Sequence, residues 1–350
     1  MWLVGRLQPD YKSIAEFRRM HSRAVTDAGA ELVRFARAVG LVRGETVALD
    51  GSQFRAVSSA KSLRERNAVK RYLEQLEVAD AQEEVVIDSS AVQAALEKLK
   101  SDAEPEARFM RTANGFVLAY NGQTAVDAEH DLIVAQKVTD EATDNRSLLP
   151  MAEAAKQAVG DPPSLNLVAD AGYSNGEQAE TCESQGIVLH VPAQRAVNNQ
   201  GDGTLFDRSE FHYDEKTDTF RCPANQTLSR KQLQRHKTRV VYAGDAEVCG
   251  ACTMKSRCTN APQRFVHRHL HDGALQRMQQ RATPEMMRLR RSTVEHPFAS
   301  LKYHIFGNPR FLLRGLQGTQ TEISLATMLY NLKRMMNVLG ANRLQAVLAG

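Results

Sequence analysis

The sequence predicts a mixed α/β fold in which a central sheet is flanked by helices. Short apolar runs rich in β-branched residues end in an Asp and then a Gly, at 45–51 and again at 165–172. Such runs are typical of buried strands that meet turns. Helical periodicity surrounds them, most clearly over 323–340. The 350 residues can bury at least one full core, which favours two domains or one domain with a large insertion.

Residues 1–44 are predicted to form an N-terminal helical segment, with a helix over 30–39 that ends at a glycine. The strands that follow are expected to stop at Asp50 and Asp170. Both carboxylates would then lie at carboxyl ends of strands, where open α/β sheets bind ligands. Taken alone, either Asp is more often a turn residue that bonds its own backbone.

The first part of the core is predicted to span 45–195, with a charged helical insertion at about 61–107. Antiparallel strands are expected over 116–126 and 132–138, and a helix over 147–159 leads to the strand of Asp170. Asp127 lies between the two antiparallel strands and is interpreted as a hairpin residue.

A small insertion of short strands and turns is predicted over 196–264. It holds four of the five cysteines, which are Cys222, Cys249, Cys252 and Cys258. A Cys-x2-Cys pair with two further cysteines at ribbon-like distances predicts a structural Zn²⁺ site with four thiolate ligands. Disulfides are rare in cytosolic proteins, so the alternative is a reduced turn without metal.

The second part of the core, 265–345, contains the stretch that organises the site. Arg291, Glu295 and Lys302 are spaced to return to one side of a helix. A neighbouring apolar stripe is expected to face the core and comprises Val294, Phe298, Leu301 and Ile305. Pro297 favours a helix that starts near His296, which would leave Arg291 on the preceding segment. The plainer alternative is a solvated face with an ion pair.

A later helix is predicted over 323–340, and its glycine end is typical of a helix terminus. The residues expected to pack on the sheet are Leu325, Met328, Leu329 and Leu332. The chain carries a formal net charge of +4, and seven Lys/Arg against two acidic residues fall between 281 and 314. A basic rim of this kind favours a polyanionic partner. No apolar run of about 18 residues and no signal peptide are found, which predicts a cytosolic protein.

Several of these segments resemble the DDE transposases of bacterial insertion sequences that carry a tyrosine-arginine-glutamate-lysine signature. The likeness rests on Asp50-Gly-Ser, on Ala169-Asp-Ala-Gly-Tyr173 and on the spacing of Arg291, Glu295 and Lys302. Segments 115–127, 139–144 and 330–334 are similar to the same family, and the likeness runs from about 2 to 340. The resemblance implies an RNase H-like fold, with which the expected order of strands and helices agrees.

The resemblance also implies a chemistry, namely metal-dependent cleavage and strand transfer of DNA. Asp50, Asp170 and Glu295 would hold two Mg²⁺ ions, which prefer carboxylate oxygens. Arg291 and Lys302 would contact DNA phosphates, and Arg288, where the family has tyrosine, would add a third contact. The expected partners are the DNA of the element ends and the target DNA, bound by a homo-oligomer. The protein is expected to be cytoplasmic and associated with the bacterial nucleoid, with no membrane partner.

Two departures from the family pattern leave alternatives open. Ala171 replaces a basic residue that often follows the second Asp, and residues 1–6 resemble the middle of the family's N-terminal region, so its first part is expected to be missing. The alternatives are an inactive DNA-binding remnant of a transposase, or another RNase H-like nuclease that acts on RNA or branched DNA.

Overall fold

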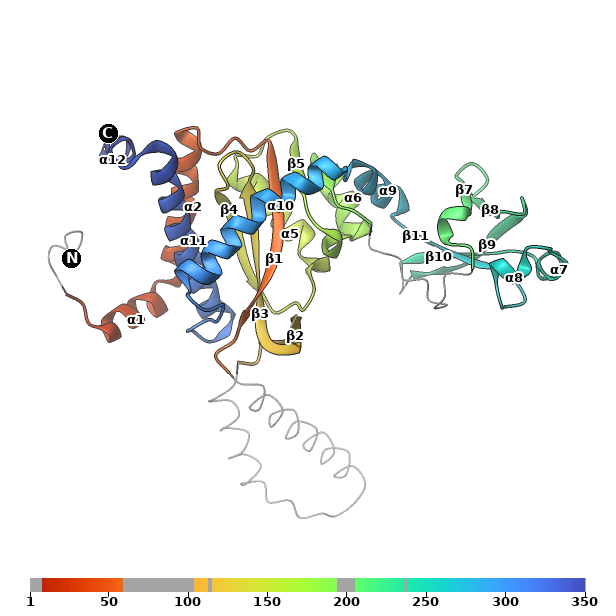
Figure 1. The fold of residues 1–350 in the computed structure, drawn as a ribbon, viewed down its shortest axis with the longest axis horizontal. Helices are drawn as coiled ribbons and strands as arrows, with labels where there is room; N and C mark the ends of the chain where they lie inside the picture. Colours follow the sequence, from red (N-terminus) through yellow and green to blue (C-terminus); the bar gives the residue numbers. More distant parts are fainter. Residues whose placement is uncertain (1–7, 59–103, 113–114, 194–204, 236–237, 350) are drawn as a thin grey trace, which may run out of the picture.

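The computed structural model describes residues 8–58, 104–112, 115–193, 205–235 and 238–349. The ribbon in Figure 1 shows a central sheet, a bundle of N- and C-terminal helices at one end and a second, smaller sheet at the other. Most of the predicted helical insertion, at 61–103, lies outside the described residues, as does the beginning of the second predicted insertion, at 196–204.

The central sheet has six strands and confirms the predicted fold class. Its path runs β2-β3-β1-β5-β6, with β4 also paired to β3; β3 is antiparallel to β1, whereas β5 and β6 run parallel to it. This mixed order around a central first strand is RNase H-like. The bounds are β1 Thr46–Arg55, β2 Arg108–Thr112, β3 Gly115–Asp127, β4 Ile133–Thr139, β5 Leu165–Val168 and β6 Ile187–His190.

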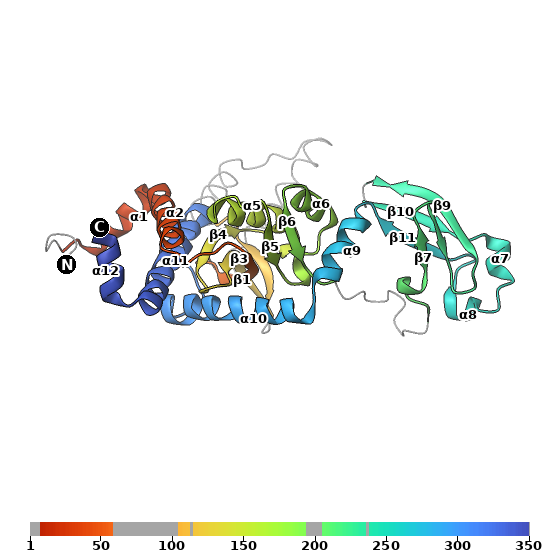
Figure 2. The same ribbon diagram turned by 90° about the horizontal axis from the view of Figure 1, so that it is seen from above.

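Helices cover both faces of this sheet. In Figure 2, α5 (Leu148–Ala158) and α6 (Gly176–Ser184) lie on one face and α10 (Pro284–Ala299) runs along the other. Side chains of a strand alternate between faces, so neighbouring residues of β1 enter different cores. Val47 and Leu49 join the cluster under α5, and Ala48 joins the cluster under α10. The predicted arrangement, a sheet flanked by helices, is thus confirmed.

Helix α10 corrects the expectation drawn from Pro297. The helix begins at Pro284, with the hydroxyl of Thr283 accepting from the Met286 amide, and continues through Pro297. Arg291 therefore lies on the same helix as Glu295, not on a preceding segment. A π-helical turn, Ser300–Ile305, follows, in which the Phe306 amide bonds the Leu301 carbonyl. The predicted core stripe is confirmed, because Val294, Phe298 and Leu301 are buried and Ile305 packs against them.

The terminal helices pack together beside the sheet. They are α1 Tyr11–Met20, α2 Ser22–Ala38, α11 Gly315–Leu339 and α12 Ala341–Ala349. A further helix, α9 (Asp272–Arg281), precedes α10 in the chain. Helix α2 begins eight residues earlier than predicted. Among the described residues, no helix is long and apolar enough to cross a bilayer.

The buried face of α11 differs from the predicted one. Leu329 and Leu332 are exposed, whereas Tyr330 and Asn331 are buried. The reason lies in strand β4, whose outward backbone groups need partners. The Asn331 side-chain amide exchanges both hydrogen bonds with Ile133, accepting from its amide at 2.9 Å and donating to its carbonyl at 2.8 Å. Polar residues of α11 thus take the sheet-facing positions that the leucines were expected to hold.

The second sheet has five antiparallel strands in the order β11-β10-β9-β8-β7. They are β7 His212–Asp214, β8 Thr219–Arg221, β9 Thr227–Gln234, β10 Arg239–Ala243 and β11 Phe265–His269. A small core of Phe211, Phe220, Leu228, Val240, Tyr242 and Val266 supports it. Short strands and turns were predicted here; the zinc-ribbon character is not confirmed, since the body of this region is a sheet with its own apolar core.

Asp127 has the structural role that the sequence indicated. It is buried at the end of β3, where its two carboxylate oxygens accept from the amides of Gly44 at 2.9 Å and Glu129 at 3.1 Å. Burial raises the pKa of this carboxyl group, and the backbone donors oppose that shift. The side chain therefore fixes the hairpin turn to the loop before β1.

Asp127→Ala is expected to lower the free energy of unfolding by about 2 kcal/mol, because two inward-facing amides lose their acceptor. Urea unfolding followed by circular dichroism measures this. Glu129→Ala removes a nearby, more exposed carboxylate that pairs with Arg43, and should change stability by about 0.5 kcal/mol or less. Equal effects of the two substitutions would contradict the assigned role.

Candidate active site

Two predicted site residues, Asp50 and Asp170, come from neighbouring parallel strands. Ala48 of β1 is paired with Val168 of β5, so the same register continued by two residues sets Asp50 beside Asp170. Asp170 follows the end of β5, as predicted, and its carboxylate caps the turn at Ala171–Tyr173 by accepting from the Gly172 amide at 2.8 Å.

Asp50 does not end its strand, which corrects the sequence expectation. Strand β1 continues to Arg55, because beyond Asp50 it remains paired with β3. Asp50 nevertheless lies beside the carboxyl end of β5, because the last residue of β5, Val168, is paired with Ala48 in the middle of β1. The two carboxylates are therefore at one edge of the parallel pair, as the ligand-binding argument required.

A residue outside the predicted set, Arg290 of α10, joins the two aspartates. Its Nη2 atom donates to Oδ1 of Asp50 at 2.5 Å and lies 3.4 Å from Oδ2 of Asp170. Its Nε atom reaches the Leu49 carbonyl at 3.4 Å. The Arg290 side chain is 13% exposed, so this contact is better shielded from water than a surface ion pair. A signal was present in the sequence, because Arg290 lies one helical turn before the buried Val294.

A third carboxylate, Asp144, lies against the same site and was noted in the sequence only as part of a resembling segment. Its Oδ1 accepts from Asn121 at 2.8 Å and from Gln123 at 2.6 Å. Tyr173, which is buried, donates its hydroxyl to the other end of the Gln123 amide. This network holds Asp144 behind the two aspartates.

The glycine next to Asp50 makes room for Asp144. A Cβ atom on Gly51 would lie 2.3 Å from Oδ1 of Asp144, and a Cβ atom on Gly172 would lie 2.9 Å from Oδ1 of Asp170. The Asp-Gly sequence at 50–51 was interpreted as a turn, whereas its glycine permits close approach inside a strand.

Burial is the largest electrostatic effect on Asp50, and the charges around it add smaller effects. Burial raises the pKa of Asp50 to about 6; the Arg290 guanidinium opposes this shift, while Asp170 and Asp144 add to it. Asp50 is thus held in a setting that disfavours its charge, and the setting favours any cation that can bind its oxygens.

Glu295 is on α10 but is exposed and stands apart from the pair of aspartates. At about 100° per residue, it points roughly 140° away from Arg290 around the helix. In the ranges that the structure describes, no group of three or more Asp, Glu, His or Cys side chains is arranged to hold a metal ion. The structure therefore brings Asp50 and Asp170 together and leaves Glu295 outside their immediate contact.

The three residues predicted to contact phosphates also differ in their distance from the aspartates and in their burial. Arg288 and Arg291 are exposed on α10. Lys302, in the π-helical turn, is partly buried with its ammonium 5.6 Å from the centre of the Phe54 ring. Burial lowers the pKa of Lys302 and the charge of Asp50 raises it. Lys302 is thus close enough to the site for the charge of Asp50 to act on it.

The four cysteines of the second sheet converge on one cavity of about 210 Å³. Cys222 follows β8, Cys249 belongs to α7 (Ala246–Gly250), Cys252 follows it, and Cys258 ends α8 (Lys255–Cys258). All are free thiols. Burial raises the pKa of Cys258, Arg264 opposes the shift, and the other three thiols add to it. The thiols are neighbours, although they do not form a ready-made ligand set in the described structure.

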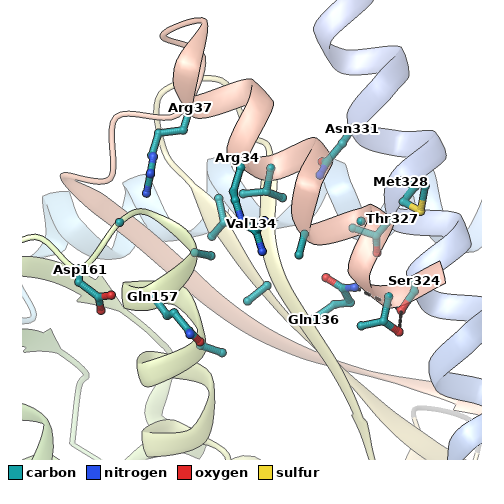
Figure 3. A pocket seen from close by; sticks show the side chains of 18 residues that line it. Arg34, Arg37, Val134, Gln136, Gln157, Asp161, Ser324, Thr327, Met328 and Asn331 are labelled. Atoms are coloured by element: carbon teal, nitrogen blue, oxygen red, sulfur yellow. Dashed lines mark hydrogen bonds between the residues drawn. The ribbon is translucent and has the colours of Figure 1, made fainter. Parts of the chain in front are cut away.

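A separate cavity, of about 560 Å³, lies between α2, β4, α5 and α11. Figure 3 shows Arg34 and Arg37 of α2 at this cavity, with Gln157 and Asp161 on the opposite wall. None of the predicted catalytic residues lines it, so it is distinct from the candidate active site.

The sheet that sets these two aspartates side by side is RNase H-like in its strand order. A model of the transposase DDE domain matches residues 80–332, and the chain therefore belongs to the transposase DDE domain family. No curated protein matches the chain. Membership in this family makes the protein a transposase-family protein of DNA transposition, with a metal-binding DDE domain.

The donor chemistry at each candidate metal centre fits the expected group. Asp50 and Asp170 offer oxygen atoms to one shared cation, the guanidinium of Arg290, and Mg²⁺ prefers oxygen ligands. The four thiols that share a cavity match the ligands of structural Zn²⁺.

Proposed function

We propose that the protein is an active transposase that cleaves DNA at the ends of an insertion sequence and joins those ends to target DNA. The observation that carries this proposal is the meeting of Asp50 and Asp170 at one edge of β1 and β5, under a helix that also bears Glu295. Family membership supports the reaction class, and the paired carboxylates support its dependence on divalent metal.

In this proposal Asp50 and Asp170 hold the divalent ions, and Glu295 completes the ligand set. Bound Mg²⁺ would supply charge stabilisation for in-line displacement at phosphorus. The side chains of Asp144 and Gln123 lie against Gly51, the residue next to Asp50. Arg288, Arg291 and Lys302 bind the phosphates beside the scissile bond, with arginine as a two-pronged donor and lysine as a point charge.

The experiment uses a supercoiled plasmid that carries the gene together with its natural flanking DNA. Purified protein and Mg²⁺ are expected to nick or excise at defined positions, and EDTA should stop the reaction. Cleavage that continues in EDTA would overturn the metal-dependent mechanism. DNA binding with no cleavage under any divalent metal would favour the alternative, an inactive DNA-binding remnant of a transposase. The observation that favours this alternative is that Glu295 lies outside the contacts of the aspartate pair.

The oligomeric state and the extent of the insertion are also proposals. We propose that DNA is bound by a homo-oligomer, since both element ends must be processed together. Because β11 pairs with β10, we propose that the insertion continues to about residue 269, beyond the sequence boundary of 264.

We further propose a structural Zn²⁺ ion held by Cys222, Cys249, Cys252 and Cys258. The small core of the second sheet comprises few residues, and small domains of this kind gain stability from a metal. Gly244 supports the arrangement, because a Cβ atom at that position would lie 2.8 Å from the Cys249 sulfur.

Purified protein is expected to retain one equivalent of zinc per chain after dialysis, measured by atomic emission. Cys249→Ser should abolish retention and lower the melting temperature of the insertion, because thiolate ligands hold structural zinc. The matched control is Cys182→Ala, which removes a buried thiol of α6 remote from the cluster. Zinc absent from the wild type, or retained by Cys249→Ser, would contradict the site.

A further inference from the structure

The contacts of Arg290 carry an inference that deepens the proposed function and rests on it. Arg290 is bound to the two aspartates that we propose as metal ligands, at 2.5 Å from Asp50 and 3.4 Å from Asp170. A guanidinium carries one positive charge, while two neighbouring carboxylates, with Asp144 behind them, carry more negative charge than it neutralises. The site is therefore occupied by an internal cation that only partly balances it.

We propose that Arg290 is a resident counter-ion that holds Asp50 and Asp170 together and competes with the divalent cation for the same oxygen atoms. The guanidinium must leave at least Oδ1 of Asp50 before a metal ion can bind that atom. Metal affinity is then lowered by the free energy needed to break the arginine contact, which links metal binding to the position of α10.

The burial of the pair supports a large effect of this competition. The Arg290 side chain is 13% exposed and that of Asp50 23% exposed, so solvent screens the contact less than it screens surface pairs. The neighbouring Arg291 is exposed and makes no ion pair with the described residues, so it provides a charge of the same type on the same helix without the contact.

Arg290 also anchors α10 to the central strand. Besides the two carboxylates, it reaches the Leu49 carbonyl, and four residues later Val294 is packed in the core below α10. Release of the guanidinium would remove the polar half of this anchor and leave the apolar half. Glu295 lies next to Val294, so the segment whose anchor weakens is the one that carries the third proposed ligand.

The test measures Mn²⁺ binding to metal-free full-length protein by isothermal titration calorimetry, without DNA, at fixed pH and ionic strength. Arg290→Gln is expected to bind Mn²⁺ at least about tenfold more tightly than wild type, because the competitor is gone and two carboxylates lack a partner. Arg290→Lys keeps a cation and should stay within about threefold of wild type, and Arg291→Gln should match wild type.

A second readout guards against misfolding. Without metal, Arg290→Gln should melt at a lower temperature than wild type, and saturating Mn²⁺ should raise its melting temperature by more degrees than it raises that of wild type. Equal or weaker Mn²⁺ binding by Arg290→Gln, in a variant that melts cooperatively, would overturn the competition while leaving the proposed metal site intact. If Mn²⁺ binds neither protein, or binds equally to Asp50→Asn, the metal site itself is wrong and the inference falls with it.

Discussion

Replacing Asp50 with Asn is expected to lower metal-dependent DNA cleavage by about 10³-fold or more, since metal-ion stabilisation of the transition state contributes several kcal/mol and each 1.36 kcal/mol is a factor of ten. The amide has nearly the same shape but holds a divalent cation far less well than a carboxylate. Asp50 is central in β1, adjacent to Arg290 and to Asp170, so its loss removes the charge around which the site is built.

The fold should survive this change. Asp50 lies in a setting that disfavours its charge, with a pKa raised to about 6 by burial. A neutral side chain is therefore tolerated, although Arg290 loses one of its two carboxylate partners. The matched control is Asp27→Asn, an exposed carboxylate of α2 that is 69% exposed and far along the chain from the site. Single-turnover cleavage of the plasmid substrate, with circular dichroism melting alongside, separates catalysis from folding.

Loss of both activity and the folded state in Asp50→Asn would instead indicate a structural carboxylate. Cleavage within a few-fold of wild type, by a protein that melts normally, would remove Asp50 from the proposed ligand set. Asp170→Asn is expected to behave in the same way as Asp50→Asn, because the two side chains share one cation in the structure.

Glu295→Gln is expected to lower cleavage by a similar factor of about 10³, while leaving thermal stability unchanged, because a third carboxylate completes the charge that holds two metal ions. Thermal stability should not change because the Glu295 side chain is exposed on α10. Exposed carboxylates without buried partners seldom contribute to stability. The combination of a large catalytic effect and no stability effect distinguishes a ligand from a surface residue.

The control for Glu295→Gln is Glu285→Gln, on the first turn of the same helix and also exposed. It should retain cleavage within about twofold, and a helix-end charge of this kind is worth less than about 1 kcal/mol of stability. If Glu295→Gln cleaves as well as Glu285→Gln does, the third ligand must be sought elsewhere, and Asp144, whose charge already acts on Asp50, becomes the next candidate.

The succession of β1, β3, β4 and β5 along the chain could be predicted because its signal is strong and local. Apolar runs around 47–50 and 165–169 are short, β-branched and bounded by turn residues, and the antiparallel pair has a clear hairpin at Asp127. The end of β1 was predicted wrongly, because Asp-Gly is typical of turns. Here Gly51 is a glycine because the side chain of Asp144 approaches it closely in the folded protein. A contact between residues so far apart in the sequence leaves no local pattern.

The candidate site was only partly accessible to sequence reasoning for a related reason. Spacing on a helix identifies residues that share a face, but it does not say which face meets the sheet. Val294 and Phe298 set that face, and they turn Arg290 toward the aspartates and leave Arg291 and Glu295 toward solvent. On α11 the leucines were expected to pack inward, yet strand β4 required hydrogen-bonding partners and Asn331 took the position.

The central claim is that Asp50 and Asp170 together bind a divalent cation, and the most direct measurement is an anomalous difference map from crystals of the wild-type protein grown with Mn²⁺. The account predicts a peak at metal–oxygen bonding distance, about 2.2 Å, from a carboxylate oxygen of both residues. A well-ordered site in saturating Mn²⁺ with no peak between the two carboxylates would contradict it.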